Sequence, residues 1–151
     1  MENIRKYTDS DKEFVYQTKK EAYQKYFEKH FGSWNEEKQR EYFNEYINKT
    51  FDNTFIIEDN KKSIGFYNEI DMEDGNCILG NICIIPDYQR RGIGTRVLKS
   101  IIASHQDNNI FIQYFKENPV GNLYKKLGFI PAGETEIYYQ MVKLKEKKHI
   151  K

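Results

Sequence analysis

The sequence predicts a mixed α/β (α+β) fold, in which a central sheet of about seven strands is flanked by four helices. Two N-terminal segments carry apolar residues at helical spacing. Short apolar segments bounded by polar turns follow them and alternate with two further helical segments. A chain of 151 residues has the size of one domain, so we expect residues 1–151 to form a single domain.

The N-terminal part predicts one strand followed by two helices. A short strand is expected at residues 4–7. Ser10-Asp11-Lys12-Glu13 has the spacing of a capping box and predicts a helix that runs to about Lys29. Residues 30–34 break the helical pattern, and Asn35 is suited to cap a second helix. The apolar face of this second helix is expected to comprise Tyr42, Phe43, Tyr46, Ile47 and Phe51.

The remaining part predicts strands joined by turns, with two shorter helices. Strands are expected at 54–59 and 63–70, with polar turns at 60–62 and 73–75. The long apolar segment Cys77–Ile85 is typical of a strand in the middle of a sheet. The other expected elements are a helix from Gly94 or Thr95 to about His105, a strand at 109–115, a helix at 118–127 closed by Gly128, and strands at 129–132 and 137–144.

The segment after the long strand combines glycines and arginines at the start of a helix. Gly92 and Gly94 leave no Cβ to exclude an anion, and Arg90 and Arg91 add positive charge. Backbone N–H groups at a helix N-terminus point in one direction, where the helix dipole adds positive potential. A phosphate or pyrophosphate suits such a turn, although a strand-to-helix turn that binds nothing has the same residues. We expect a cofactor here.

Two other phosphate-binding motifs do not fit this segment. A dinucleotide-binding turn requires a Gly or Ala where this chain has Val97, and an acid about 20 residues later. The turn lies past the midpoint of the chain, and no acid precedes Glu117 in residues 108–118. A P-loop requires Gly-Lys-Ser/Thr, which does not follow. A second motif further along the chain decides which interpretation we adopt.

Two motifs occur in the order and separation of one known family. The first is Gln89-Arg90-Arg91-Gly92-Ile93-Gly94, which resembles the pyrophosphate-binding motif of the GNAT superfamily of acyl-CoA N-acyltransferases. The second is Asn118-Pro119-Val120-Gly121-Asn122-Leu123-Tyr124-Lys125-Lys126-Leu127-Gly128-Phe129, which resembles that superfamily's next segment. The resemblance covers residues 53–142 and rests on element order alone over residues 1–52. It implies the GNAT fold, whose element order matches the one predicted above.

The resemblance implies an N-acetyltransferase that uses acetyl-CoA and a primary amine of a small molecule or peptide. In this family two strands, corresponding here to 78–85 and 109–115, splay apart and admit the pantetheine arm. The resemblance assigns coenzyme A contacts to the backbone of one strand, to the glycine loop and to two asparagines: Ile82, Cys83, Ile84, Gln89, Arg90, Arg91, Gly92, Ile93, Gly94, Thr95, Asn118 and Asn122. Asn118 also suits a helix N-cap before Pro119.

Attack of an amine on a thioester requires three things of the protein. The amine must be neutral although its free pKa is near ~10, the oxyanion needs a donor, and the departing thiolate needs a proton. A backbone N–H near Ile84 is suited to the oxyanion. Tyr124 matches the Tyr that commonly faces the CoA sulfur in this family, so the resemblance implies a general acid. Aromatic packing against the sheet is the alternative reading of Tyr124.

The sequence leaves the general base and the acceptor site open. No Glu or Asp lies between Cys77 and Ile85, where some family members carry one. The break at 30–34 and the turn at 71–75 are expected to line the open side of the cleft, and suit a cationic amine of modest size. The candidates are His30, Trp34, Glu69, Asp71, Glu73 and Asn81; a helix-end histidine, a core tryptophan and solvated turn acids are the alternatives. The acceptor side also includes Tyr67, Glu28 and Glu37, which the sequence does not rank.

Composition excludes several functional classes. A net charge of +1 gives no electrostatic reason to expect nucleic acid or acidic membranes as partners. No apolar run approaches the ~20 residues of a membrane helix, and the N-terminus lacks the apolar core of a signal peptide. Cys77 and Cys83 would lie roughly 20 Å apart on one strand, too far for an intrachain disulfide. We expect a cytoplasmic, bacterial protein, a monomer or homodimer, without a metal site.

Two functions of other classes stay open. One is a GNAT-fold module that binds acyl-CoA and senses it without turnover, which the missing base would fit. The other is a non-enzymatic interaction domain whose tyrosine-rich helices at 10–51 bind a partner. A coenzyme A release assay over a panel of amines, together with a coenzyme A binding measurement, separates these functions.

Overall fold

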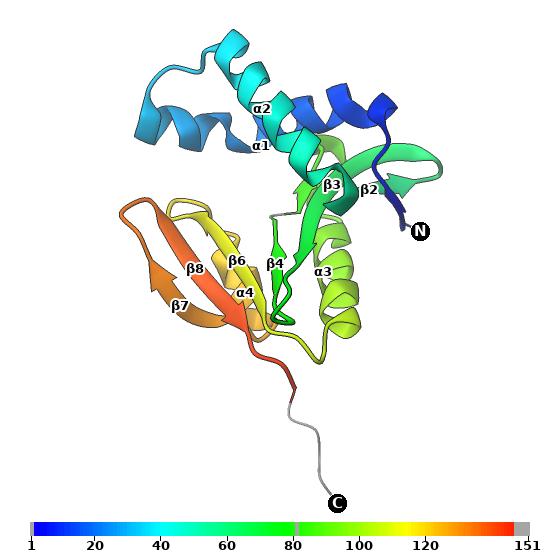
Figure 1. The fold of residues 1–151 in the computed structure, drawn as a ribbon, viewed down its shortest axis with the longest axis vertical. Coiled ribbons are helices and arrows are strands. Elements are labelled where there is room, and N and C mark those ends of the chain that lie inside the picture. The colour runs from blue at the N-terminus through cyan, green and yellow to red at the C-terminus, as the bar shows by residue number, and fades with distance from the viewer. Residues whose placement is uncertain (1, 81, 147–151) are drawn as a thin grey trace, which may run out of the picture. The chain divides into compact units, whose positions relative to one another are not determined.

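The structure is a computed structural model that describes residues 2–80 and 82–146. Within these residues eight strands form a mostly antiparallel sheet and are accompanied by four α-helices (Figure 1), which confirms the mixed class. The elements are β1 (Glu2–Lys6), α1 (Lys12–Phe31), α2 (Glu36–Thr50), β2 (Thr54–Asp59), β3 (Lys62–Asp71), β4 (Cys77–Leu79), β5 (Cys83–Ile84), α3 (Ile93–Ser104), β6 (Ile110–Phe115), α4 (Gly121–Lys126), β7 (Ile130–Glu134) and β8 (Tyr138–Lys143).

The contacts divide the chain into two compact units, and β3 contributes to both. The first unit comprises residues 1–68 and 82–94, and the second comprises residues 69–81 and 95–151. In the first unit β1, β2, β3 and β5 pair antiparallel in that order. In the second unit the order of paired strands is the end of β3, then β4, β6, β8 and β7. Among these pairs only β4 and β6 are parallel.

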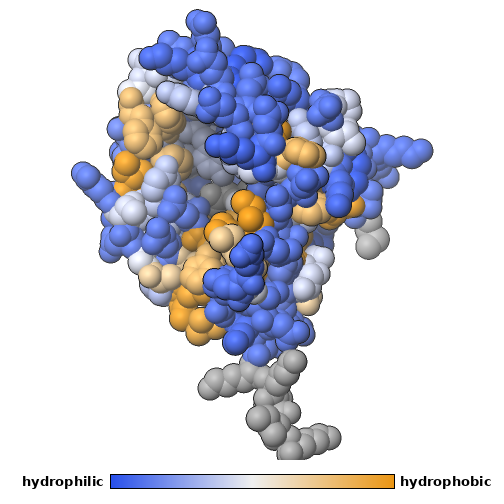
Figure 2. All heavy atoms as spheres, viewed as in Figure 1, coloured by the Kyte–Doolittle hydropathy of each residue, from blue (hydrophilic) through white to orange (hydrophobic). Residues whose placement is uncertain are grey.

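The first unit buries one face of each of its two long helices. Val15 and Tyr16 of α1 and Phe43 and Ile47 of α2 pack in one core with Ile56 of β2. The rings of Tyr16 and Phe43 meet edge to face at 5.3 Å between centroids, which fixes where the two helices cross. The part of α2 that faces the viewer in Figure 2 is hydrophilic, as expected for a helix that buries a single stripe.

The capping box begins at Thr8, two residues before the predicted box at Ser10–Glu13, and caps a short turn that leads into α1, so that prediction was wrong. A short 3-10 turn, Asp9–Asp11, precedes the helix, and the Asp11 carboxylate accepts a 2.8 Å hydrogen bond from the Thr8 N–H. Asp11 also accepts two hydrogen bonds of 2.8 Å from the guanidinium of Arg5. Glu13 instead faces Arg40, at 2.9 Å.

Helix α2 has the predicted cap but a narrower apolar face than predicted. The side-chain oxygen of Asn35 accepts a 3.0 Å hydrogen bond from the Lys38 N–H, which confirms the cap. Tyr42 and Phe51 are 61% and 50% exposed, so their place in the apolar face was wrong. Phe51 follows the end of the helix, and Tyr42 lies beside the stripe that Phe43 and Ile47 form four residues apart.

The predicted long strand at 77–85 is two short strands, so a single strand there was wrong. Leu79 of β4 lies opposite Glu69 of β3, and Cys83 of β5 lies opposite Phe66. A regular ladder would place residue 82 opposite Phe66, so this segment contains one residue more than its partner strand. Such an extra residue interrupts a ladder, and it also raises the strand count from about seven to eight.

In the second unit α3 matches its prediction and α4 is shorter than predicted. Val97, Leu98 and Ile101 of α3 are buried. Their spacings of one, three and four residues place them on one stripe of the helix. Helix α4 begins after Val120 rather than at Asn118, so Asn118 as the N-cap was wrong. Asn118 instead accepts a 3.0 Å hydrogen bond from the Val120 N–H and closes the preceding turn.

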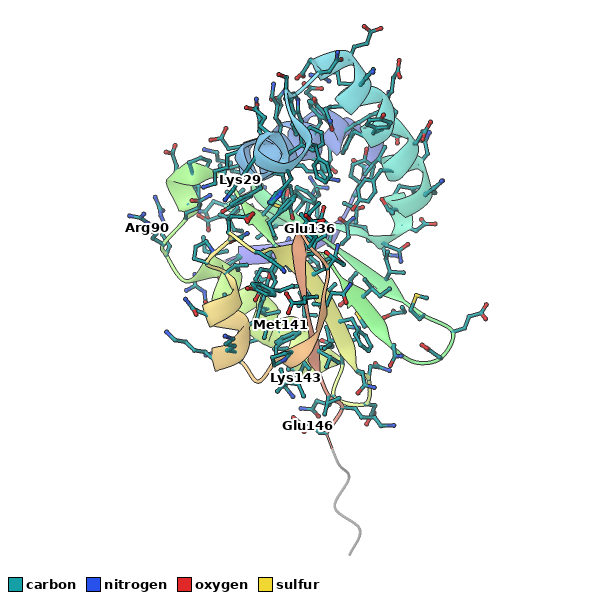
Figure 3. All side chains as sticks on the ribbon, turned by 90° about the vertical axis from the view of Figure 1, so that its left-hand side faces the viewer. Lys29, Arg90, Glu136, Met141, Lys143 and Glu146 are labelled. Atoms are coloured by element: carbon teal, nitrogen blue, oxygen red, sulfur yellow. The ribbon has the colours of Figure 1, made fainter. Side chains whose placement is uncertain are left out.

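One face of the second unit's sheet carries a row of apolar side chains. The strand registers place Ile78, Phe111, Val142 and Ile130 side by side across β4, β6, β8 and β7. Ile78 and Ile130 are 43% and 47% exposed. Figure 2 shows hydrophobic residues gathered over this part of the molecule. Figure 3 shows the chain running from Glu136, just before β8, to Met141 and Lys143 of that strand.

Candidate functional site

The glycine loop of the first unit joins β5 to α3 through a tightly folded turn. A 3-10 turn, Pro86–Tyr88, begins it, and the Gln89 N–H donates a 3.2 Å hydrogen bond to the Pro86 carbonyl. The side chain of Gln89 donates a 2.8 Å hydrogen bond to the Ile84 carbonyl. Arg90 and Gly92 have φ values of +63° and +76°, a left-handed backbone that reverses the chain before the helix.

The loop exposes positive charge in front of a helix N-terminus. Arg90 and Arg91 are exposed, and Figure 3 shows the Arg90 side chain extending away from the ribbon. The Arg91 guanidinium lies 4.6 Å from the centroid of the Tyr88 ring. A Cβ built on Gly94 would meet nothing within 4 Å, so space is open beside the first turn of the twelve-residue helix α3. This arrangement suits an oxyanion such as a phosphate.

Strand β5 offers backbone groups beside the loop. Among the described strands it pairs only with β3, through Gly65 opposite Ile84 and Phe66 opposite Cys83. A Cβ on Gly65 would collide with the Cys83 carbonyl, so a glycine is needed for this close approach. Cys83 is buried and donates a 3.8 Å hydrogen bond to the Tyr23 hydroxyl. Burial raises the pKa of the Cys83 thiol to about 11, so this residue is a neutral core thiol.

Tyr124 lies in the second unit, on α4, and is only 3% exposed. Its ring meets the ring of Tyr114 edge to face at 5.5 Å and that of Phe129 at 5.6 Å between centroids. The Phe129 N–H donates a 3.0 Å hydrogen bond to the Tyr124 carbonyl in a Schellman motif that ends the helix, with Gly128 at φ +97°. Tyr124 is therefore held in a fixed place, whereas Asn122 of the same helix is exposed.

An aromatic cleft of about 160 Å³ surrounds Trp34 in the first unit. Lys19 lies 3.9 Å from the centroid of the Tyr46 ring, and burial lowers the pKa of its ammonium group. The Trp34 indole N–H donates a 3.1 Å hydrogen bond to Glu36, which also holds Lys20 at 2.8 Å. Two lysine ammonium groups therefore line this cleft. The sequence analysis did not predict either lysine as part of an acceptor site. The lining residues are Tyr16, Lys19, Lys20, Trp34, Gln39, Tyr42, Phe43 and Tyr46.

The histidine candidate lies elsewhere than predicted. His30 belongs to the last turn of α1, which continues to Phe31, so its place in the break between the helices was wrong. The helix continues because Phe27, four residues before, packs on the Phe31 ring at 5.1 Å and on Trp34 at 5.4 Å. His30 therefore fits the helix-end reading that the sequence left open.

Two of the predicted carboxylates come together with residues that sequence reasoning missed. In the second unit, His105 Nε2 lies 3.4 Å from Glu69 and 3.3 Å from Asp71. Cys77 is buried beside them, opposite Asp71 in the β3–β4 ladder. The alternation of Glu69 and Asp71 on one strand predicts a shared face, but nothing in the sequence shows that the end of α3 reaches it. Burial raises the pKa of Glu69 above its usual range.

The other two acceptor candidates, Glu73 and Asn81, do not belong to the clusters described above. Glu73 is exposed in the turn that Gly75, at φ +86°, closes with a 3.0 Å hydrogen bond to the Met72 carbonyl. Asn81 lies outside the described residues. Within residues 2–80 and 82–146, no helix is both long and apolar enough to cross a membrane.

Comparisons with known proteins give one consistent result. Residues 51–131 match the sequence profile of the acetyltransferase (GNAT) domain. The chain is 35% identical over 99 residues to an uncharacterized N-acetyltransferase, ycf52, of Gracilaria tenuistipitata var. liui. It is 31% identical over 85 residues to an uncharacterized N-acetyltransferase, YobR, of Bacillus subtilis (strain 168). These matches cover 58% and 54% of this chain but only 54% and 34% of the two relatives.

A solved structure gives the same fold. The PaiA N-acetyltransferase of Thermoplasma acidophilum, solved in complex with coenzyme A, has a TM-score of 0.73 to this chain at 19% identity. The similarity covers 95% of this chain and 99% of that one, so it includes most of the first 52 residues, for which the sequence offered element order alone.

Proposed function

The chain belongs to the acetyltransferase (GNAT) domain family, and from this premise we propose that it transfers an acetyl group from acetyl-CoA to a primary amine of a small molecule or peptide. The observation that carries the proposal is the glycine loop, in which two exposed arginines and an open Gly94 precede the twelve-residue helix α3. Both motifs of the resemblance, residues 89–94 and 118–129, fall wholly within the family match, which covers residues 51–131.

The pyrophosphate of coenzyme A is proposed to bind the backbone N–H groups from Arg90 to Thr95. The Gln89 N–H already donates to Pro86, so the available donors begin one residue later than the motif suggests. The first N–H groups of a helix have no partner within the helix, and the dipole favours an anion there. Arg90 and Arg91 add charge that water screens only partly at close range. Backbone groups of Ile82, Cys83 and Ile84 are proposed to contact the pantetheine arm.

Tyr124 is proposed to act as the general acid. During transfer the amine nitrogen forms a bond to the acetyl carbon, the carbon–sulfur bond breaks, and the thiolate takes a proton. A phenol is a neutral donor at pH 7 and can supply that proton. The ring of Tyr124 is fixed by Tyr114 and Phe129, which supports a positioned donor because a fixed hydroxyl loses little freedom when it reacts.

The acceptor is proposed to bind at the aromatic cleft around Trp34. Aromatic walls with a few polar groups are typical of small-molecule sites. The cleft carries Lys19 and Lys20, and Glu36 neutralises the second. An amine acceptor that also bears a carboxylate would therefore suit the cleft better than a polyamine, which changes the expectation of a purely cationic acceptor.

A two-part experiment tests the proposed function. Calorimetry with acetyl-CoA measures donor binding, and thiol release measures turnover over amino acids, polyamines, aminoglycosides and peptide N-termini. Binding with acetyl-CoA-dependent release on at least one amine supports the proposal. Binding without release over the whole panel would indicate an acyl-CoA-sensing module. No binding of acetyl-CoA would contradict both and favour an interaction domain.

A further inference from the structure

Four side chains that can bind a metal converge in the second unit, and we call them the His105 cluster: Glu69, Asp71, Cys77 and His105. Glu69 and Asp71 lie two residues apart on β3 and therefore point to the same face of the sheet. Cys77 lies directly opposite Asp71 on β4, so its side chain points to that face too. His105 follows the last residue of α3 and lies on the same face.

The hydrogen bonds of His105 fix which ring nitrogen faces the carboxylates. Nδ1 lies 2.9 Å from the Ile101 carbonyl, which can only accept, so Nδ1 carries a hydrogen. In a neutral ring Nε2 then presents a lone pair to Glu69 Oε1 at 3.4 Å and Asp71 Oδ1 at 3.3 Å. Three electron-rich atoms at these distances repel, so either a proton, on Nε2 or on a carboxyl oxygen, or a metal cation belongs among them.

The distances fit a metal cation. A tetrahedral ion with bonds of about 2.0–2.1 Å to nitrogen and oxygen separates its ligand atoms by about 3.3 Å. The two distances from Nε2 have this value. Ligand atoms of Glu69, Cys77 and His105 all lie within 4.8 Å of one another. A carbonyl that accepts from Nδ1–H is also the usual second partner of a histidine whose Nε2 binds a metal.

We propose that the His105 cluster binds one Zn²⁺ ion through Cys77 Sγ, His105 Nε2 and a carboxylate oxygen of Glu69, with Asp71 as the fourth ligand. A thiolate, an imidazole and carboxylates are the donor set that zinc takes in proteins. The side chains of Glu69 and His105 are only 17% and 11% exposed, and Cys77 is fully buried, so three ligands are shielded from water. Asp71 is 76% exposed and is free to turn toward the ion.

Binding replaces one proton by the metal. A cysteine without a metal or a nearby cation is mostly a thiol at pH 7, so the metal-free protein holds Cys77 as a thiol. Zn²⁺ binds the thiolate, and the thiol proton leaves to the solvent. The ion would join β3, β4 and the end of α3, which gives it a structural role. This inference does not depend on the proposed acetyl transfer.

Cobalt binding tests the site, because Co²⁺ replaces Zn²⁺ and reports its ligands by absorption. Untagged full-length protein is freed of metal with a chelator and titrated with Co²⁺ and then Zn²⁺. We expect one equivalent, a near-ultraviolet thiolate-to-cobalt band and visible bands of a tetrahedral ion, all removed by Zn²⁺. Free Zn²⁺ at about 100 times its Kd should raise Tm by about 5–10 °C, whereas Mg²⁺ should not.

Matched variants assign the ligands. Cys77→Ser should abolish the thiolate band, and His105→Gln should weaken Zn²⁺ binding at least tenfold, whereas Cys83→Ser, at the other buried cysteine, should change neither. Circular dichroism checks that each variant is folded; if Cys77→Ser does not fold, His105→Gln and Cys83→Ser decide the outcome. No stoichiometric Zn²⁺ on the parent protein would overturn the inference and leave His105 as a polar contact of two carboxyl groups. Zn²⁺ binding of parent affinity in folded His105→Gln would overturn it as well.

Discussion

The side-chain amide of Gln89 donates a hydrogen bond of 2.8 Å to the Ile84 carbonyl, which ties the glycine loop to β5. Gln89 is therefore a residue that positions the loop, rather than one whose side chain is directed at a ligand. Gln89→Leu removes this donor and keeps the size of the side chain. A net hydrogen bond is worth about 1 kcal/mol, so we expect the Kd for acetyl-CoA to rise about fivefold.

Calorimetry measures this change, and kinetics should show a higher KM for acetyl-CoA with kcat at saturation unchanged. Gln17→Leu is the matched control, because Gln17 donates a 3.0 Å hydrogen bond to Glu13 on the surface of α1. An unchanged Kd in folded Gln89→Leu would show that the Ile84 contact does not order the loop.

Gly94 tests whether the helix N-terminus holds the pyrophosphate. A side chain there meets no protein atom within 4 Å, so Gly94→Val is tolerated by the fold but fills the space proposed for the anion. We expect calorimetry to show a loss of acetyl-CoA affinity of at least about tenfold, or 1.4 kcal/mol. Gly92→Val should do the same but also strain the backbone, because its φ is +76°.

Gly32→Val is the control for that strain, since Gly32 has φ +90° and a Cβ built on it would meet nothing within 4 Å. It should lower Tm as Gly92→Val does and leave acetyl-CoA binding intact. Parent-like affinity in folded Gly94→Val and Gly92→Val together would move the phosphate site away from the loop.

Tyr124→Phe tests the general acid. The change removes one hydroxyl and keeps the ring between Tyr114 and Phe129. A positioned acid contributes about 10²–10⁴-fold, so kcat should fall by that factor while the KM for acetyl-CoA stays within about twofold. Tyr114→Phe, on the neighbouring ring, should keep most of kcat. Steady-state kinetics on the best amine of the panel measures both, and an unchanged kcat in Tyr124→Phe would leave Tyr124 a packing residue.

Asp11 gives the first unit a pH-dependent stability. The hydrogen bonds from Arg5 hold the pKa of this buried carboxyl below its usual range. A lowered folded-state pKa means that the stabilisation is complete above the unfolded pKa of about 3.9 and is lost as the pH falls through the folded pKa. Asp11→Asn should therefore cost about 1.5–3 kcal/mol at pH 7 and progressively less below about pH 4.

Urea unfolding at several pH values measures this difference. Glu13→Gln is the matched control, because Glu13 makes the same two-bond contact with Arg40 but is 63% exposed. Exposed pairs contribute little, so Glu13→Gln should change stability slightly at any pH. An Asp11→Asn variant whose cost does not depend on pH would contradict the prediction.

Elements that depend on neighbours along the chain could be predicted from local patterns of residues. Strand β2 has the predicted bounds, 54–59, because a β-branched and aromatic segment ends at a two-residue turn in which Asn60 and Lys61 have positive φ. Asn35 caps α2 as predicted because capping depends only on the next three residues. Both glycine-containing motifs could be recognised for the same reason.

Features that depend on pairing between distant segments could not be predicted. The extra residue between β4 and β5 appears only in the register of each strand on β3, whereas composition alone favours one long strand. The His105 cluster depends on where α3 ends relative to the β3–β4 hairpin. The sequence did not predict that Lys19 lines the aromatic cleft, because a lysine on a helix is ordinarily exposed to solvent.

Trp34 and Glu73 are tested separately as candidates for the acceptor site. Trp34 walls the aromatic cleft, so Trp34→Ala should raise the KM for the amine about tenfold, and Trp34→Phe should restore most of it. Glu73 is an exposed acid, so Glu73→Gln should raise the KM of a cationic amine at low salt, with an effect that fades as salt rises. The KM for acetyl-CoA should stay nearly unchanged in all three variants.

Two controls separate these effects from general ones. Asp107→Asn removes another exposed acid of the second unit and should leave the amine KM as in the parent. Asp71→Asn should alter metal binding rather than the amine KM, because Asp71 lies 3.3 Å from His105. If Trp34→Ala and Glu73→Gln both leave the amine KM unchanged, neither residue belongs to the acceptor site, and the part of α2 outside the aromatic cleft becomes the next place to mutate.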